Sequence, residues 1–378
     1  MNYKMKNFKF VFIIISTFVL IFVLSFSSFA FDETAYETFD DSGAYEVFDS
    51  LDEETKEILS DLGIEDINAE SVFKISPKRI VEEIIKIVSG KLAEPIKLFF
   101  TLSLILIIES VFKSVSNEEK NSISEIIFIL LISTAAAVPS YEVITFAASF
   151  LLTASDFLIS FIPVYAFLLS SSGNITQALN FNTLLYGASQ LIISVSKNIL
   201  IPVMGVLMSL NIASSVNPIL SLNKITGTFK KVVTVTLTLI STLFIGFLSF
   251  KGSVAASVDA LTVRSIRTVS GSVIPFIGSS LADAYSSVLG SLKLINNCFG
   301  FLGIITVCVL TLPIIIELLL YYFSLHLASV AGEMLGCESS KILEGMAGVI
   351  SIVNIIVIFV SVIFTVSIGI VLKAGGSV

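Results

Sequence analysis

The stretch AGVISIVNIIVIFVSVIFTVSIGIVL, residues 347–372, contains no charged side chain. At a rise of about 1.5 Å per residue, a helix of this length can cross the roughly 30 Å hydrocarbon core of a bilayer. The rest of the chain has a similar composition, because 55% of all residues are hydrophobic and only 14% are charged. Soluble domains carry about 25% charged residues. The chain is therefore expected to be an all-α, polytopic integral membrane protein.

Further apolar segments predict additional crossings towards the N-terminus. The segment 123–169 is too long for a single crossing and contains two prolines, so it is expected to form two helices. Basic residues lie on both sides of the apolar segments, and the positive-inside rule therefore does not determine the orientation. About seven transmembrane helices are expected after an N-terminal signal, at residues 96–111, 123–169, 184–210, 232–250, 298–327 and 347–372.

Residues 1–30 have the features of a secretory signal peptide. Lysines at the start precede an apolar run from Phe10 to Leu24, and Ser28 and Ala30 supply the small residues that signal peptidase requires. Cleavage after Ala30 is expected. An uncleaved anchor is the alternative, because the apolar run is long for a signal peptide. In both cases the following residues are delivered across the membrane.

The segment that follows, residues 31–75, is expected to be exported and is strongly acidic. Between Asp32 and Glu70 it carries 15 acids and one base, whereas the whole chain has a net charge of -8. It contains one expected helix, which Asp52 can cap and Gly63 can end. The segment is either a docking surface for a partner or a solvated spacer. The expected apolar face of its helix consists of Leu51, Thr55, Ile58, Leu59 and Leu62.

Residues 76–95 predict a second amphipathic helix. Ser76 and Pro77 suit the N-cap and the first turn, and Lys78, Glu82 and Lys86 form a ladder of opposite charges at a spacing of four. A helix of this kind lies on a membrane surface or packs against a partner. Its expected apolar face consists of Ile80, Val81, Ile84, Ile85, Val88 and Leu92.

Ionisable side chains inside the expected crossings are candidates for function, since each costs about 3 kcal/mol at the bilayer centre unless it faces protein or water. Lys197, Asp156 and Glu317 lie in such segments, and Glu109 lies near the end of another. Glu317 follows Pro313 by one turn, so a helix kink and a carboxylate are expected close together. The alternative to a functional site is an internal ion pair or a side chain that extends to the interface.

Within the membrane domain, residues 96–378, the segment 251–297 is the least lipid-like. It is rich in Ser, Ala and Gly, which permit close approach of helices, and Arg264 and Arg267 fall on one helical face. It is re-entrant, lines a cavity or forms an extramembrane helical pair, and the pattern leaves these three possibilities open. The candidate pore-lining or helix-pairing residues of the whole chain are Lys197, Asp259, Arg264, Arg267, Asp283 and Glu317.

Side chains that most enzymes need are scarce. His326 is the single histidine, which excludes a metal site built on several histidines, and the chain has no P-loop, GxGxxG or GxSxG motif. Pairs such as Ser194 with Lys197 are expected by chance, because serine is abundant. The three cysteines are an odd number without a CxxC motif and are expected to be apolar fillers. No catalytic site, metal, cofactor or nucleic-acid partner is expected.

Several stretches resemble one known family. They are FKGSVAASVDALTVRSIR at residues 250–267, SVIPFIG at 272–278 and LADA at 281–284, with FIP at 161–163 before Ser172 and Gly173, and the segment from 201 to 211. Together they resemble stage III sporulation protein AE of endospore-forming bacteria. The resemblance covers roughly residues 96–378, and its most specific part is 250–303. The acidic segment is similar only in kind.

The resemblance implies a polytopic subunit made in the mother cell and placed in the membrane that engulfs the forespore. Its implied partners are other stage III sporulation proteins, including a secretion-type ATPase and ring-forming subunits, a forespore protein across the intermembrane space, and the lipid bilayer. The implied function is a non-enzymatic part of a channel or secretion-like apparatus. A stand-alone small-solute transporter is the alternative, and an intramembrane hydrolase is a third hypothesis that the missing motifs disfavour.

Overall fold

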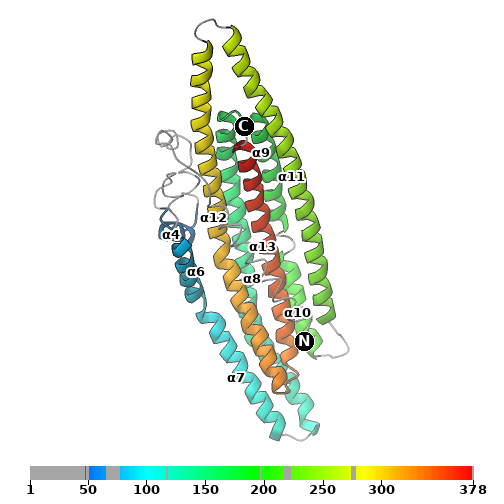
Figure 1. The fold of residues 1–378 in the computed structure, drawn as a ribbon. Helices are drawn as coiled ribbons and strands as arrows, with labels where there is room; N and C mark the ends of the chain where they lie inside the picture. Colours follow the sequence, from blue (N-terminus) through cyan, green and yellow to red (C-terminus); the bar gives the residue numbers. More distant parts are fainter. Residues whose placement is uncertain are drawn as a thin grey trace.

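The computed structural model describes residues 47, 51–64, 77–115, 118–195, 198, 200–216, 223–273 and 278–376. The regular structure of these residues is helical, in agreement with the sequence prediction. Figure 1 shows an elongated bundle whose long helices run along one common axis. The helices are α4 (Glu53–Asp61), α6 (Pro77–Lys91), α7 (Ala93–Val115), α8 (Glu118–Ser171), α9 (Ile175–Val195), α10 (Ile201–Val216), α11 (Asn223–Val273), α12 (Gly278–Met334) and α13 (Ser340–Gly376).

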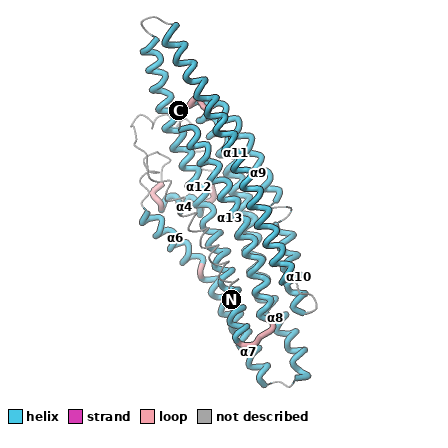
Figure 2. The backbone as a smooth tube through the Cα atoms, turned by 45° about the vertical axis from the view of Figure 1, so that its right-hand side comes forward, coloured by secondary structure: helices cyan, strands magenta, loops and turns pink. Residues whose placement is uncertain are grey.

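The centre of the bundle is an antiparallel pair formed by α12 and α13. In the most apolar window of α12, 89% of the residues are buried, and in that of α13, 61%. Figure 2 shows the other long helices arranged around this pair. The absence of charge in residues 347–372 of α13, on which the sequence prediction was based, is therefore explained mainly by protein packing and not only by lipid.

Close packing of α8 against α12 depends on glycine. A Cβ added at Gly303 would overlap the ring of Phe161, and one added at Gly300 would lie 2.6 Å from the hydroxyl of Tyr165. The ring of Phe161 stacks on that of Phe299, with 4.9 Å between centroids. The two glycines therefore leave the space that these buried aromatic rings occupy.

Five helices of the described residues are long and apolar enough to cross a membrane, not the seven expected. The segment 123–169 was expected to form two helices, but it belongs to one helix, α8, which contains both Pro139 and Pro163. A proline removes one backbone hydrogen bond and can kink a helix without ending it. The expected crossing at 184–210 is divided between α9 and α10. The predicted signal peptide lies outside the described residues.

Both predicted amphipathic helices form, but the second is shorter than predicted, because α6 ends at Lys91 and Pro95 already belongs to α7. Asp52 caps α4 by accepting hydrogen bonds from the backbone N–H and the hydroxyl of Thr55, and Gly63 follows the helix with a φ of 93°. The buried face of α6 differs from the prediction. Glu83 is buried, whereas Val81 and Ile85 are exposed, because α6 packs on α4 as well as on the bundle.

The polar segment 251–297 is largely helical. Residues 251–273 continue α11 and residues 278–297 begin α12. In Figure 1 these ends reach beyond the ends of α9 and α13. Of the three possibilities that the sequence left open, the structure therefore agrees with a pair of helices.

Candidate functional site

Lys91, at the end of α6, lies where helices from three parts of the chain meet. Its Nζ is 3.1 Å from Oε1 of Glu54 on α4 and 3.5 Å from Oε2 of Glu317 on α12. The same Nζ lies 5.3 Å from the ring centroid of Phe146 on α8, within the range of a cation–π interaction. We call Lys91, Glu54, Glu317 and Phe146 the polar junction.

The junction compensates a carboxylate that is largely removed from water. The side chain of Glu317 is 19% exposed and that of Lys91 is 27% exposed. Glu317 follows Pro313, whose missing N–H leaves the carbonyl of Val309 without its usual helical partner. Burying the carboxylate of Glu317 without a cation beside it would be costly. Because Lys91 supplies that cation, the ion pair holds the end of α6 against this part of α12.

A cavity of about 200 Å³ lies beside the junction. Side chains of α4 form one wall of it, and the other walls come from two helices of the bundle. Its lining is therefore mixed, with carboxylates and hydroxyls next to apolar groups. The lining residues are Asp52, Glu54 and Thr55 of α4, Phe146, Ser149, Phe150 and Thr153 of α8, and Leu310, Pro313 and Ile314 of α12.

Further ion pairs join α4 to α6. Lys86 binds Asp61 and lies 3.1 Å from Oε1 of Glu57. Hydrogen bonds to Asp61 and Glu57 raise the pKa of Lys86. Burial raises the pKa of Glu83 against the opposing effect of Lys86. These exposed pairs contribute little each to stability because water screens them, but they set the register of the two helices.

The pKa of Lys91 results from two opposing effects. Burial alone would lower it, but the hydrogen bond to Glu54 and the charges of Glu317 and Glu54 outweigh burial and raise it. The lysine is therefore charged at neutral pH. The arrangement can bind and orient charged groups, and it offers no nucleophile paired with a base.

The six candidate residues from the sequence do not converge on one site. Glu317 belongs to the polar junction, and Asp259 lies on α11 against the start of α9. Arg264 is exposed on α11. Arg267 and Asp283 are in helical segments whose side chains at these positions are not described, and Lys197 lies outside the described residues.

Asp259 caps a helix from a distance in sequence. Its carboxylate accepts hydrogen bonds of 3.0 Å each from the backbone N–H groups of Thr176 and Gln177, in the first turn of α9. The side chain is 4% exposed. A helix N-terminus has unpaired N–H groups and a partial positive charge, so this carboxylate stabilises α9 and ties it to α11. Asp259 therefore joins the start of α9 to α11 in this structure.

Two other acids from the sequence have different surroundings. Glu109 is fully buried, accepts a hydrogen bond from Ser339 and lies 3.8 Å from Lys113, so it holds the turn between α12 and α13 against α7. Asp156 is exposed on α8. Glu109 thus forms an internal ion pair with Lys113, as Glu317 does with Lys91.

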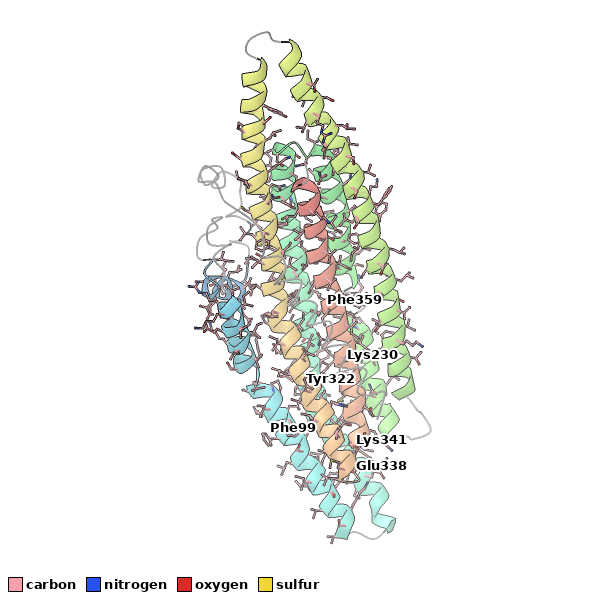
Figure 3. All side chains as sticks on the ribbon, viewed as in Figure 1. Phe99, Lys230, Tyr322, Glu338, Lys341 and Phe359 are labelled. Carbon is pink, nitrogen blue, oxygen red and sulfur yellow. The ribbon has the colours of Figure 1, made fainter. Side chains whose placement is uncertain are left out.

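Two interactions were not foreseen from the sequence. The sequence did not identify Lys91 and Glu54 as candidate residues. An amphipathic pattern shows which side of a helix is polar, but not which of its charges contacts a helix that is distant in sequence. The Nζ of Lys230 donates a 2.7 Å hydrogen bond to the hydroxyl of Ser351 on α13. Figure 3 shows Lys230 beside α13, above Glu338 of the turn between α12 and α13 and Lys341 at the start of α13. A lysine beside an apolar run is normally expected to extend to the membrane surface. The sequence therefore provided no reason to expect a contact with α13.

The described residues contain no group of three or more His, Cys, Asp or Glu side chains that could hold a metal ion. Cys298, Cys308 and Cys337 are buried and free, in agreement with their expected role as fillers. His326 is half-buried, and its ring stacks on that of Tyr322, with 5.7 Å between centroids.

The fold and the junction together define a helical membrane protein whose N-terminal amphipathic helices are tied by charge to its bundle. The model of the family "Stage III sporulation protein AE" matches residues 63–375, and the chain belongs to this family. Stage III sporulation protein AE of Bacillus subtilis (strain 168) is 25% identical over 287 residues, which are 74% of this chain and 71% of that protein. No solved structure matches the chain. Membership of this family implies a role in sporulation.

Proposed function

We propose that this protein is a non-enzymatic membrane subunit of the stage III channel or secretion-like apparatus that links mother cell and forespore. It acts in the mother-cell membrane that engulfs the forespore and is needed for forespore development. Membership of the sporulation family supports the biological role. The observation that carries the mechanism is the polar junction, because it connects two N-terminal helices to a proline-containing helix of the bundle.

The helices α4 and α6 present a surface suited to a partner protein. Glu53, Glu57 and Asp61 are exposed on α4, and Val81 and Ile85 are exposed on α6. An apolar patch with a charged border is typical of protein interfaces. A partner that binds there pulls on Lys91 and therefore on α12. We expect such partners among the other stage III proteins, including the ring-forming subunits and a forespore protein, while the secretion-type ATPase acts from the mother-cell side.

Co-purification from sporulating cells tests this proposal. The full chain is extracted in mild detergent, and the proteins that accompany it are identified. Recovery of the stage III ATPase and the ring-forming subunits supports a subunit of the apparatus. Recovery of the chain without them, at wild-type expression, contradicts it.

A matched pair of variants tests whether the polar junction is needed for these partners to bind. Lys91→Glu places a third carboxylate beside Glu54 and Glu317, so we expect loss of the ring-forming subunits from the purified material. Lys97→Glu is the control, because Lys97 is 75% exposed and contacts only its near neighbour Glu94 among the ion pairs of the described residues. Equal recovery of partners with both variants would remove the junction from the proposed mechanism.

The basic residues near the end of α11 provide a second test. We expect the double variant Arg264→Ala with Arg267→Ala to remain in the membrane and to block forespore development. Arg264 is exposed, so its loss removes no buried partner. Degradation of the variant would show that the arginines maintain the fold instead.

A stand-alone transporter of small solutes is the second candidate, and the cavity beside the junction is the observation that favours it. It predicts solute flux by the purified protein alone in vesicles. Glu317→Gln keeps the shape of the side chain and removes its charge. Flux in vesicles that Glu317→Gln abolishes would support this candidate, and normal sporulation with Glu317→Gln would exclude a transport role for Glu317.

A further inference from the structure

The cavity beside the polar junction is lined by carboxylates on the side of α4. Asp52 and Glu54 both belong to the lining, and an ionised carboxylate accepts hydrogen bonds but cannot donate them. Both residues are exposed, so water reaches the cavity from the side of α4. Figure 1 shows α4 against α12, which supplies another wall. A ligand that enters beside α4 therefore meets carboxylate oxygens first.

The three hydroxyl groups of the lining already donate their protons within the chain. The hydroxyl of Thr55 donates to Asp52. The hydroxyls of Ser149 and Thr153 donate to backbone carbonyls of their own helix, α8. Each of these oxygens keeps lone pairs with which it can accept a further hydrogen bond. The polar side chains of the lining are therefore complementary to a ligand that donates.

The charges around the cavity sum to a negative value. The lining contributes Asp52 and Glu54, and the adjoining junction contributes Glu317 and Lys91. Three carboxylates and one ammonium group leave an excess of two negative charges. The N-terminus of α4 adds a partial positive charge of about half a unit, which is too small to offset them. A positively charged ligand is therefore favoured.

The remaining walls suit the stem and the head of an organic cation. Phe146 and Phe150 line the cavity, and the face of an aromatic ring attracts cations. Phe146 already lies 5.3 Å from the Nζ of Lys91, which shows that a cation is accommodated on this ring. Leu310 and Ile314 of α12 supply apolar surface for an alkyl chain.

Size and composition exclude other classes of ligand. The volume of about 200 Å³ is below the roughly 300–1,000 Å³ of pockets that hold drug-sized molecules. An anion would be repelled by the carboxylates of the lining. A metal ion is not suited either, because the described residues contain no group of three or more acidic, histidine or cysteine side chains that could hold one. A small amine or a single basic side chain fits both the size and the charge.

We propose that this cavity binds an alkyl cation, whose ammonium or guanidinium head contacts Asp52 and Glu54 and whose stem lies along α8 and α12. The source of the cation is either a lysine or arginine side chain of a partner protein or a free small amine. The choice between these sources rests on the proposed function, because a subunit receives a side chain of its partner and a transporter receives a free solute. The preference for a cation does not depend on that choice.

Occupation of the cavity affects the polar junction through Glu54. This carboxylate lines the cavity and also lies 3.1 Å from the Nζ of Lys91. A second cation at Glu54 competes with Lys91, which then keeps Glu317 as its remaining carboxylate partner. Binding at α4 is thereby coupled to α12.

A cysteine in the cavity tests the charge preference of the purified full chain. Thr153→Cys is modified with aminoethyl methanethiosulfonate, which is cationic, and with sulfonatoethyl methanethiosulfonate, which is anionic. The ratio of the two rates cancels the fraction of thiolate, which both reagents require. Ser60→Cys is the control, because Ser60 is exposed on the same acidic helix and does not line the cavity. We expect the cation-to-anion ratio to be about tenfold higher at Thr153→Cys than at Ser60→Cys. The three native cysteines are buried, and the chain without an added cysteine gives the background rate.

Two matched substitutions assign the preference to the lining. Asp52→Asn removes one charge of the cavity and keeps the cap, because asparagine caps a helix as well as aspartate does. Glu53→Gln removes one charge of the same helix outside the lining. We expect Asp52→Asn to lower the ratio at Thr153→Cys several-fold and Glu53→Gln to change it little. An unchanged rate with the neutral methyl methanethiosulfonate shows that α4 stays in place in both variants.

Protection by a free amine completes the test. Butylammonium should slow the modification of Thr153→Cys by the neutral reagent, whereas butanol should not. Equal effects of the two compounds, or a ratio at Thr153→Cys no higher than at Ser60→Cys, would show a cavity that holds water only and overturn the proposal.

Membranes of sporulating cells distinguish the two sources of the cation. A Thr153→Cys that stays unreactive in washed membranes and reacts once the chain is purified identifies a side chain of a bound partner. A Thr153→Cys that reacts in washed membranes identifies a free amine. Absence of the co-purifying stage III proteins together with a retained charge preference would contradict the proposed function and leave the cation site intact.

Discussion

A single ammonium group, that of Lys91, connects three helices that are far apart in sequence. Its two carboxylate partners come from α4 and α12, and the ring of Phe146 comes from α8. Because the site is partly buried, water cannot fully replace these contacts. At the residue scale, the position of α4 and α6 on the bundle therefore depends on a few charged side chains with specific partners. Each of these side chains can be tested by a single substitution.

Removing the charge of Lys91 should release α4. Lys91→Gln leaves Glu54 and Glu317 without their cation, at an expected cost of about 1–2 kcal/mol in docking free energy. Spin labels at Glu53→Cys on α4 and Ser160→Cys on α8 measure the docking through their distance distribution. We expect a broader and longer distribution with Lys91→Gln than with the control Lys97→Gln. Identical distributions would contradict this role of Lys91.

The same pair of spin labels also tests how the docking of α4 depends on pH. The pKa of Lys91 is raised in the folded protein, so its contribution to docking is fully present below the unfolded pKa of about 10.4 and is lost as the pH rises through the folded pKa. We expect unchanged label distances between pH 7 and 9 in the wild-type background. Broadening within that range would mean that another group controls the docking of α4.

The cap that Asp259 forms on α9 is a second interaction that a single substitution can test. Asp259→Ala removes two hydrogen bonds to the first turn of α9 and should lower stability by about 1–2 kcal/mol. The thermal unfolding temperature in detergent measures this loss. Arg264→Ala on the same helix is the control, because Arg264 is exposed, and it should leave the temperature unchanged. An equal decrease for both variants would show that the cap contributes nothing specific.

At the scale of elements, the bundle depends on how closely α8 approaches α12. Gly303 lies against the rigid ring of Phe161, so an added methyl group has no space. Gly290, on the same helix, has no other atom within 4 Å of an added Cβ. Two glycines of one helix therefore have opposite roles, and their sequence context does not distinguish them.

Alanine at these two glycines should change stability in opposite directions. Gly303→Ala forces Phe161 to move and should cost about 1–3 kcal/mol. Gly290→Ala should add about 0.5–1 kcal/mol, because alanine favours a helix and meets no obstacle. Thermal unfolding in detergent reports both changes. A Gly303→Ala protein as stable as wild type would show that α8 and α12 are less closely packed than described.

At the scale of the whole molecule, the surface of the bundle differs from one side to another. Apolar side chains are exposed on α7, α8 and α11, whereas the acidic helix α4 packs against α12 and lines the cavity. The central pair α12 and α13 runs along the bundle. A change at the junction can therefore be transmitted to other parts of the bundle along α12.

The burial of all three cysteines gives a prediction for the intact molecule. Cys298, Cys308 and Cys337 are buried and form no disulfide. We expect no maleimide labelling of the native protein in detergent and labelling of all three thiols after unfolding in dodecyl sulfate, as counted by mass spectrometry. Labelling of the native protein at Cys337 would indicate that the turn between α12 and α13 opens.

The sequence by itself determined the helical class, the membrane setting, the family, the cap of α4 by Asp52 and the positions of the amphipathic helices. These properties depend on composition and on local periodicity, which are readable along the chain. Glu317 and Asp259 were also recognised as polar groups in apolar surroundings. Only the tertiary structure decided that Lys91 neutralises Glu317, that Asp259 caps α9 and that α8 continues through its prolines, because each depends on which distant helix lies alongside. The same reason explains why long apolar helices were read as lipid-facing, although in α12 and α13 most of that surface faces other helices.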